Sequence, residues 1–460
     1  MAWPAEAPHG LSREQIKTIS DVLTQMMAQL PEPRERGFHG MRPRPTTREW
    51  LAAGRPGIIV PGDRRMPKPI QRDHRLLTRI RLDNLLSFGP ESPALPMEKL
   101  NVLIGPNGSG KSNLIEAIAL MRAAHGDFRD VLREGGGFAE WIWKGNRKGQ
   151  ATVDFVVRPP KGKVPLRHLL AFRADGRLVF QLEDERIEDG SEGADQTEPY
   201  FCYQNGQPVV RTPAKRRQKL DKETFNRSRS VLSQLRHPAA YHELYSLGSA
   251  YEKIRIYREW TFGRATVFRQ PQMADLPSDR LEEDFSNLGL FVNRLRQDPH
   301  AKAAVLEGMR DLYEGVSDYD VRVVGGTIQV VFIEGKFTIP ATRLSDGTLR
   351  YLCLLAILLD PTPPPLICIE EPELGLHPDI LPKLADHLVA ASQRAQIIVT
   401  THSDILVDAM TERPEAVVVC EKHEGSTHMR RLRRDDLAAW LDKYRLGQLW
   451  TKGQLGGTRW

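Results

Sequence analysis

The segment "GPNGSGKS", from Gly105 to Ser112, constrains this chain more than any other stretch of its sequence. It satisfies the pattern G-x-x-x-x-G-K-[S/T] and stands between a short apolar segment, "LNVLI", and a segment with helical periodicity that runs from Lys111 to Ala124. A strand that enters a glycine-rich loop and then a helix presents backbone N–H groups and a positive helix end to an anion. A chance glycine-rich turn is disfavoured by this context. The sequence therefore predicts a phosphate-binding loop made of Gly105, Pro106, Asn107, Gly108, Ser109, Gly110, Lys111, Ser112 and Asn113.

Two later apolar segments end in residues that suit the chemistry of a nucleotide phosphate. In "PPLICIEEPELGLHP", a buried strand is expected to end at Glu370 and Glu371; the first carboxylate would hold Mg²⁺ and the second would orient and deprotonate a water. In "IIVTTHS", a further strand ends at His402, which is placed to sense the γ-phosphate. We therefore predict Lys111, Glu371 and His402 as catalytic residues, and Ser112 and Glu370 as metal ligands.

A third segment, "LSDGTLRYLCLLAILL", predicts a capped helix. Ser345 is a good N-cap for a helix that starts near Gly347. The N-terminus of such a helix is an anion site, yet this one has no phosphate loop of its own. By itself the segment indicates only a well-capped helix.

The run Leu344-Ser345-Asp346-Gly347-Thr348 resembles the ABC signature motif, in the variant seen in RecF-, SMC- and OLD-like ATPases. The order of phosphate loop, signature, Glu370 strand, "ELGLHP" and "THS" matches ABC ATPases throughout. The resemblance covers residues 76–150 and 340–460. Three further segments are similar to a bacterial group of RecF-like "predicted ATPases", the AAA family ATPases: "FRDVLREGGGFAEWIWKG", "EWTFGRATVFRQPQ" and "YRLGQLWTKGQLGG".

The resemblance implies an α/β fold, an ABC-ATPase head of the P-loop NTPase class, with an α+β insert between the phosphate loop and the signature. It implies ATP and Mg²⁺ as cofactors, hydrolysis of ATP to ADP and phosphate, and a homodimer, with a higher oligomer left open. In such a dimer Ser345, Asp346 and Gly347 would contact in trans the ATP held by the other subunit. Glu371 would be the base, and Glu373 to His377 would form the D-loop at the interface.

The sequence departs from the family pattern at two positions. Glu370 stands where the family usually has Asp, and the extra methylene is expected to shift the metal and slow hydrolysis. No Gln lies between Ser112 and Trp143, so the Q-loop role stays unassigned, with Gln150 as a weak candidate.

The chain is expected to consist of four segments. Residues 1–75 form an N-terminal extension, with a helix at 11–30 and then a linker rich in Pro, Arg and Gly. The ATPase lobe occupies residues 76–150 and 341–460, and residues 151–340 form the inserted α+β lobe, β-rich at first and largely helical over 221–315. Hairpins are predicted at Asp175-Gly176 and within "GGTIQVVFIEGKFTIP".

Charge and cysteine content limit the partners. The 460 residues carry a formal net charge of +6, which permits binding to nucleic acid without requiring it. We predict weak, sequence-independent binding of duplex DNA by a basic run, although a solvated charge run is an equal alternative; its residues are Arg211, Lys215, Arg216, Arg217 and Lys219. The four scattered cysteines and the lack of a long apolar run predict a reduced, cytoplasmic protein without a membrane partner.

Four functions compete. The first is an ATP-gated switch in DNA repair or anti-phage (antiviral) defence, acting with a separately encoded effector such as a nuclease. The second is a transporter motor, disfavoured because its signature usually reads LSGGQ. The third is a nuclease in its own right, disfavoured because only a short tail follows His402. The fourth is a non-catalytic, ATP-dependent DNA clamp. This alternative remains because Glu370 replaces the usual Asp.

Overall fold

The computed structural model describes residues 73–147, 149–174, 180–193, 198–214, 216–222, 225–261 and 263–457. All elements given below belong to the unit formed by residues 72–460. The expected helix at 11–30 and linker up to residue 72 lie outside the described residues, as do the turn at Asp175-Gly176 and Lys215.

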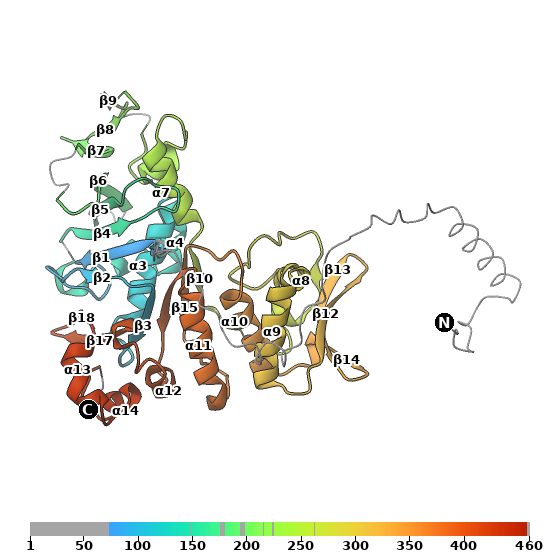
Figure 1. Ribbon diagram of the computed structural model, residues 1–460. Coiled ribbons are helices and arrows are strands. Elements are labelled where there is room, and N and C mark those ends of the chain that lie inside the picture. The colour runs from blue at the N-terminus through green and yellow to red at the C-terminus, as the bar shows by residue number, and fades with distance from the viewer. Residues whose placement is uncertain are drawn as a thin grey trace, which may run out of the picture. The chain divides into compact units, whose positions relative to one another are not determined.

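A six-stranded sheet carries the predicted motifs. Its order is β10-β15-β16-β3-β17-β18; the first five strands are parallel to one another, and β18 is antiparallel to β17 (Figure 1). Every residue of β3 and β16 is buried, as expected for parallel strands that are covered on both faces. The strands are β3 (Leu100–Ile104), β10 (Arg255–Tyr257), β15 (Leu366–Glu370), β16 (Gln396–Thr400), β17 (Val417–His423) and β18 (Ser426–Arg431).

The parallel order of β3, β16 and β15 brings their carboxyl ends to one edge. The phosphate loop follows β3, Glu370 ends β15, and His402 lies two residues after β16. Helix α3 (Lys111–Ala123) leaves the loop and confirms the helix expected from Lys111. This edge is therefore where the predicted nucleotide residues meet.

An antiparallel eight-stranded sheet forms the second layer. Its order is β2-β1-β4-β5-β6-β7-β8-β9, so the strands of segment 151–340 continue the sheet that β1 begins in segment 76–150 (Figure 1). One hydrophobic cluster joins this sheet, α3 and one face of the parallel sheet. The strands are β1 (Leu77–Asp83), β2 (Leu95–Pro96), β4 (Ala151–Val157), β5 (Leu166–Ala174), β6 (Phe180–Asp189), β7 (Phe201–Gln204), β8 (Gln207–Arg211) and β9 (Arg217–Lys219).

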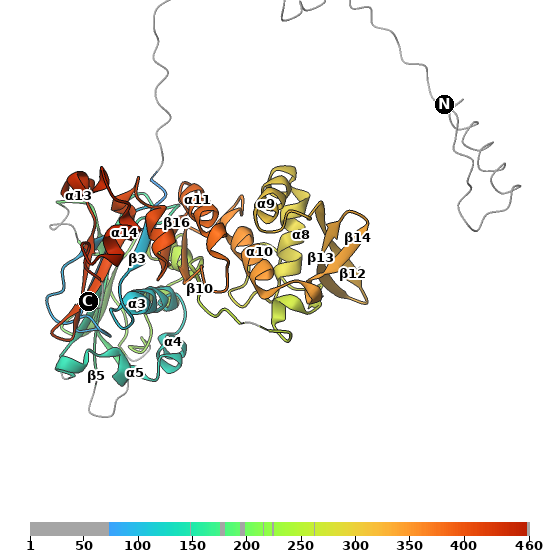
Figure 2. The same ribbon diagram turned by 90° about the horizontal axis from the view of Figure 1, so that it is seen from below.

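The signature helix α10 (Asp346–Leu358) packs against α8 (Leu288–Gln297), α9 (Pro299–Leu312) and α11 (Leu381–Ala391) (Figure 2). The Ser345 hydroxyl caps α10 as predicted. A small antiparallel sheet adjoins α8, and its β13–β14 pairing confirms the hairpin expected before residue 340. Its strands are β11 (Gln272–Met273), β12 (Asp318–Val324), β13 (Thr327–Glu334) and β14 (Phe337–Pro340).

The remaining α-helices are short segments. They are α4 (Phe128–Glu134), α5 (Phe138–Trp141), α6 (Val231–Gln234), α7 (His242–Glu252), α12 (Asp404–Asp408), α13 (Arg434–Leu441) and α14 (Leu446–Thr451). Among the described residues, none of the helices is both long and apolar enough to cross a membrane. All four cysteines are free thiols and are buried.

Candidate nucleotide site

The phosphate loop is clamped between β3 and the strands β17 and β18. Gly105, Gly108 and Gly110 have φ values of 148°, 79° and 100°, a region that favours glycine. A Cβ at Gly105 would lie 2.2 Å from the Cys420 carbonyl oxygen, and a Cβ at Gly110 would lie 2.2 Å from Oγ1 of Thr427. The backbone conformation therefore favours glycine at all three positions, and close neighbours also require it at Gly105 and Gly110. The resulting cradle fits a phosphate chain.

Lys111 lies inside this cradle. Its Nζ donates hydrogen bonds to the carbonyl oxygens of Gly105, at 2.7 Å, and Pro106, at 3.1 Å. Burial lowers the pKa of the Lys111 ammonium group below its usual value, and nearby carboxylates partly offset this effect. Of the other predicted loop residues, Asn107 and Gly108 form the exposed tip. Ser109 is buried, and Asn113 is half-buried.

Ser112 and Glu370 are brought together from positions 258 residues apart. The Ser112 hydroxyl donates a hydrogen bond of 3.3 Å to Oε2 of Glu370. Two neighbouring ligands of an octahedral Mg²⁺ at about 2.1 Å are about 3.0 Å apart, so this pair fits the ion. Burial raises the pKa of the Glu370 carboxyl group, while Arg258 and the Ser112 hydrogen bond act in the opposite direction. Within the described residues no group of three or more His, Cys, Asp or Glu side chains could hold a metal; Mg²⁺ sites commonly complete their ligand set with phosphates and water.

Glu371 and His402 face each other beside this pair. Oε1 of Glu371 lies 3.6 Å from Nε2 of His402, and both side chains are more than one-third exposed. Glu371 has a φ of 45°, an uncommon conformation for a residue other than glycine, and its amide donates to the Thr400 carbonyl oxygen at 3.0 Å. Such strained residues cluster at functional sites. Burial and, secondarily, Lys111 lower the pKa of His402, so its imidazole is neutral at pH 7.

Glu373, the first residue of the expected D-loop, contacts the segment after β16 that carries His402. Its Oε1 accepts hydrogen bonds of 2.7 Å from the Thr401 hydroxyl and from the His402 amide. The His377 side chain at the other end of this loop is exposed. Glu373 therefore fixes the backbone that carries His402.

The signature loop, residues 344–348, is fixed by contacts with Arg269, which lies between β10 and β11. The Ser345 hydroxyl accepts a 3.0 Å hydrogen bond from the Thr348 amide. The Asp346 carboxylate pairs with the buried Arg269, which also donates to the Leu344 carbonyl oxygen at 2.5 Å. Gly347 adjoins the D-loop, because a Cβ there would lie 2.9 Å from the carbonyl oxygen of Gly375.

Several residues that position the site were not predicted. Trp260 donates from Nε1 to the Glu370 carbonyl oxygen at 2.8 Å, and Arg258 pairs with Glu116 of α3. Trp260 and Arg269 belong to "EWTFGRATVFRQPQ", which the family resemblance singled out without assigning it a role. The Thr427 hydroxyl donates to the Ser109 carbonyl oxygen at 2.9 Å, and no sequence signal marked it.

Gln150, the weak candidate for the Q-loop, makes a different contact. Its side-chain amide donates a 2.6 Å hydrogen bond to Oε2 of Glu183, on the antiparallel sheet. The Q-loop role therefore receives no support from this side chain.

The predicted basic run lies on and around the edge strand β9. The Arg211 guanidinium stacks on the ring of Tyr200, 3.9 Å from its centroid, and Arg217 pairs with Glu198 at 3.1 Å. Two of the predicted cations are thus engaged within the chain. Arg216 and Lys219 are exposed.

Comparison with known proteins agrees with this geometry. Residues 100–408, well over half of the chain, match the family described as "AAA domain, putative AbiEii toxin, Type IV TA system". The uncharacterized protein YbjD of Escherichia coli is 26% identical over 349 residues, which are 68% of this chain and 56% of YbjD. The DNA double-strand break repair Rad50 ATPase of Sulfolobus acidocaldarius is 36% identical over 83 residues, or 18% of this chain and 9% of that protein. The chain thus spans little more than half the length of YbjD and about a tenth of the length of the Rad50 ATPase.

The chain also shows a distant likeness to solved SMC heads. An Smc head bound to the C-winged helix domain of ScpA has a TM-score of 0.46 and 14% identity, over 78% of this chain and 99% of that one. The SMC head domain from Thermotoga maritima has a TM-score of 0.39 and 16% identity, over 78% and 99%. By its family match, the chain belongs to the family described as "AAA domain, putative AbiEii toxin, Type IV TA system", and its motifs follow the order of ABC-type P-loop ATPases of the RecF/SMC group.

Proposed function

We propose that this chain binds ATP with Mg²⁺ at the loop 105–113, hydrolyses it, and forms the complete site only between two copies of itself. The observation that carries the proposal is the convergence of two pairs at one sheet edge. Ser112 lies 3.3 Å from Glu370, and His402 lies 3.6 Å from Glu371. One pair suits a metal, and the other suits an attacking water.

Each side chain has a separate task in this proposal. Lys111 exchanges its two carbonyl acceptors for the β- and γ-phosphate oxygens. Ser112 and Glu370 hold Mg²⁺, which neutralises phosphate charge when it is bound. Glu371 accepts a proton from the water, and the neutral His402 orients that water or the γ-phosphate. The strained backbone of Glu371, tied to Thr400, fixes the direction of its carboxylate.

The signature loop would act on the ATP of the partner copy. In each copy the Ser345 hydroxyl and the Gly347 amide stand at the N-terminus of α10, where a helix attracts anions. Arg269 and the Ser345 cap hold this end in place. A γ-phosphate supplied by the second copy would complete the site and close the homodimer.

The biological role follows by analogy with relatives. Rad50 is named for DNA double-strand break repair, and the family description names a toxin. By analogy with these names, the chain is an ATP switch in DNA repair or antiviral defence. Its cytoplasmic location, a separately encoded effector such as a nuclease, and binding of duplex DNA through the basic run are proposed from the sequence. Glu370, in place of the usual Asp, favours the second candidate, a non-catalytic ATP-dependent DNA clamp.

Two variants test the composite site. Glu371→Gln removes the base but keeps the metal ligands, so it should retain ATP and stabilise the dimer, while Lys111→Ala should lose ATP binding. Sedimentation velocity with saturating ATP and Mg²⁺ measures the dimer, and a matched control is the exposed Glu134→Gln. A monomeric Glu371→Gln chain that still binds ATP would show that the composite site is wrong. If the dimer forms but the wild type releases no phosphate, the clamp is the better description.

A further inference from the structure

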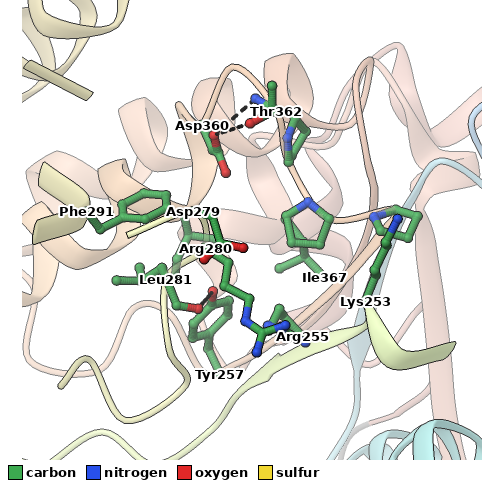
Figure 3. Close-up of a pocket in the computed structure, with 14 residues that line it drawn as sticks. Lys253, Arg255, Tyr257, Asp279, Arg280, Leu281, Phe291, Asp360, Thr362 and Ile367 are labelled. Atoms are coloured by element: carbon green, nitrogen blue, oxygen red, sulfur yellow. Dashed lines mark hydrogen bonds between the residues drawn. The ribbon is translucent and has the colours of Figure 1, made fainter. Parts of the chain in front are cut away.

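A cavity of about 280 Å³ lies at the start of β15, the end of the strand opposite to Glu370 (Figure 3). Ile367 of β15 and Arg255 of β10 line it and are register partners in the parallel pair. Ile357, one residue before the end of the signature helix, lines it as well. The cavity thus touches both the strand that carries Glu370 and the helix that Ser345 caps, and no sequence motif marks it.

Arg255 is the unusual residue of this cavity. It is only 8% exposed, and its Nη1 donates to the backbone carbonyl oxygens of Glu252, at 3.0 Å, and Ile254, at 2.8 Å. Its Nε has no hydrogen-bond partner, and within the described part of the chain the guanidinium forms no ion pair. A guanidinium stays charged in proteins, and a buried charge without a counter-charge is costly. Arg255 also lines a neighbouring pocket with Glu252, Glu282 and Glu283, but it forms no ion pair with these carboxylates. It is therefore an anion-binding group that the described residues leave incomplete.

A second cation stands at the rim. Lys253 lines the same cavity, is exposed, and forms no ion pair with any residue that the structure describes. Figure 3 shows its side chain and that of Arg255 among the residues that line the cavity. Arg280 also lines the cavity but already pairs with Glu282 at 3.3 Å.

The acids of the cavity leave part of this charge uncompensated. Asp360 pairs with Arg294 at 2.9 Å and accepts a 3.0 Å hydrogen bond from the Thr362 amide. Asp279 is exposed at the rim. Among the described residues of the cavity, two cations without a carboxylate partner, against the one unpaired carboxylate of Asp279, leave a net positive charge that favours an anionic ligand. A phosphate monoester is such a ligand near pH 7.

The remaining wall is apolar. Phe291, Leu281, Ile357 and Ile367 line it together with the three consecutive prolines 363–365. The Tyr257 hydroxyl donates its proton to the Leu281 carbonyl oxygen at 3.1 Å, so this proton is not available to an anion. A pocket with apolar walls and a few convergent charged groups is typical of small-molecule sites.

We propose that this cavity binds a phosphate monoester with a flat apolar body, and that the bound ligand changes the affinity of the chain for ATP. Ile367 and Glu370 are three residues apart on β15, about 10 Å along a strand. On the neighbouring segment, Arg255 lies three residues before Arg258, and Trp260 bonds the Glu370 carbonyl oxygen. The second part rests on the nucleotide binding proposed above; the first part does not.

Binding is tested in a chain that cannot use its phosphate loop. In a Lys111→Ala background, isothermal titration calorimetry compares phenyl phosphate, inorganic phosphate and benzoate. Phenyl phosphate should bind at least about tenfold more tightly than the other two, because only it offers both the dianion and the ring. Equal binding of benzoate would overturn the phosphate class, and no binding of phenyl phosphate would overturn the site.

Two substitutions locate the ligand. Arg255→Met should weaken phenyl phosphate binding by about tenfold or more. Lys253→Ala changes an exposed side chain, so it should leave the fold intact and weaken binding by about threefold or more. The matched control is Arg322→Ala, an exposed residue of β12. Unchanged binding in Lys253→Ala and in a folded Arg255→Met chain would place the ligand elsewhere.

The link to the nucleotide site is measured in the chain with Lys111 intact. Saturating phenyl phosphate should change the dissociation constant of a fluorescent ATP analogue by about threefold or more, and Arg255→Met should abolish that change. A change that persists in Arg255→Met would show competition at the phosphate loop and overturn the effector role, as would no change at all. If this chain does not bind the analogue, the nucleotide proposal fails, while the calorimetric result still decides the cavity.

Discussion

The indole Nε1 of Trp260 donates a 2.8 Å hydrogen bond to the backbone carbonyl oxygen of Glu370. The same ring faces the guanidinium of the buried Arg350, whose Cζ lies 4.0 Å from the ring centroid. Nη2 of Arg350 in turn donates to the carbonyl oxygen of Glu371 at 2.5 Å. Trp260 therefore contacts the backbone of the predicted metal ligand, Glu370, directly. It reaches the backbone of the predicted base, Glu371, through Arg350 of the signature helix.

Trp260→Phe should lower ATP turnover more than ATP affinity. Phe keeps a ring against Phe285, whose centroid is 5.3 Å from that of Trp260, but loses the hydrogen bond that fixes the Glu370 carbonyl. Loss of such a bond costs about 1 kcal/mol, so kcat should fall by about fivefold to tenfold while the Kd for ATP changes by less than about threefold. Steady-state hydrolysis and equilibrium binding measure the two quantities. Trp440→Phe, at a side chain that is 46% exposed, is the control; an equal loss of affinity and turnover would contradict a positioning role.

The sequence predicts the meeting of Ser112 and Glu370 because both stand at carboxyl ends of apolar strands, and parallel strands bring those ends to one edge. It does not predict Trp260, because its bond to Glu370 spans 110 residues and a backbone acceptor leaves no mark in a motif. The role of Thr427 is not predicted for the same reason, since its hydroxyl donates to the Ser109 carbonyl oxygen across 318 residues.

The sequence also does not predict which strands pair in each sheet. Alternating apolar residues predict that the chain after residue 150 is β-rich. They do not predict that β4 pairs with β1, because strand pairing depends on non-local contacts that the local pattern does not encode.

Glu370→Gln should stabilise the nucleotide-free chain at alkaline pH. The folded pKa of Glu370 is raised by burial, so its stability contribution is fully present below the unfolded pKa and is lost as pH rises through the folded pKa. The amide cannot ionise, yet it still accepts a hydrogen bond from Ser112. Without nucleotide and Mg²⁺, the variant should melt about 1–3 °C higher than wild type at pH 8, and the difference should shrink toward zero in acid.

Differential scanning calorimetry across pH 4.5–8 measures this effect. Glu412→Gln, whose side chain is 81% exposed, serves as the control and should show no such trend. A melting-temperature difference that stays constant with pH, or a less stable Glu370→Gln chain at pH 8, would show that the ionised Glu370 carboxylate does not destabilise the wild type.

Reversing the charges of β9 should weaken binding to duplex DNA. Arg217→Glu with Lys219→Glu removes two cations from an exposed edge strand, and each phosphate contact contributes about 0.9 to the slope of log affinity against log salt. The slope should therefore decrease by about 1–2 units, as measured by fluorescence anisotropy of a labelled duplex. Circular dichroism checks the fold, because Arg217 pairs with Glu198. Arg322→Glu on β12 is the charge-reversal control; the same slope in wild type and double variant would exclude this surface.

Gly347→Ala should separate ATP binding from dimer closure. Gly347 lies in the first turn of α10, and a Cβ there would lie 2.9 Å from the carbonyl oxygen of Gly375. That oxygen belongs to a backbone with a φ of 72° at Gly375, so it cannot move aside as a flexible side chain would. The clash must displace the signature loop from the D-loop, although alanine itself is favoured in a helix by about 1 kcal/mol.

The phosphate loop of the same copy makes its contacts elsewhere, with Cys420 and Thr427, so ATP affinity should stay within about threefold of wild type. ATP-dependent dimerisation, measured by sedimentation in a Glu371→Gln background, should weaken by at least about tenfold, because the displaced loop no longer presents Ser345 and the Gly347 amide to the partner's γ-phosphate. Gly248→Ala is the matched control, since a Cβ at this position of α7 would meet Leu232 at an ordinary 3.7 Å. Normal dimerisation of a folded Gly347→Ala chain would mean that the signature loop does not close over a second copy, and the composite site would have to be abandoned.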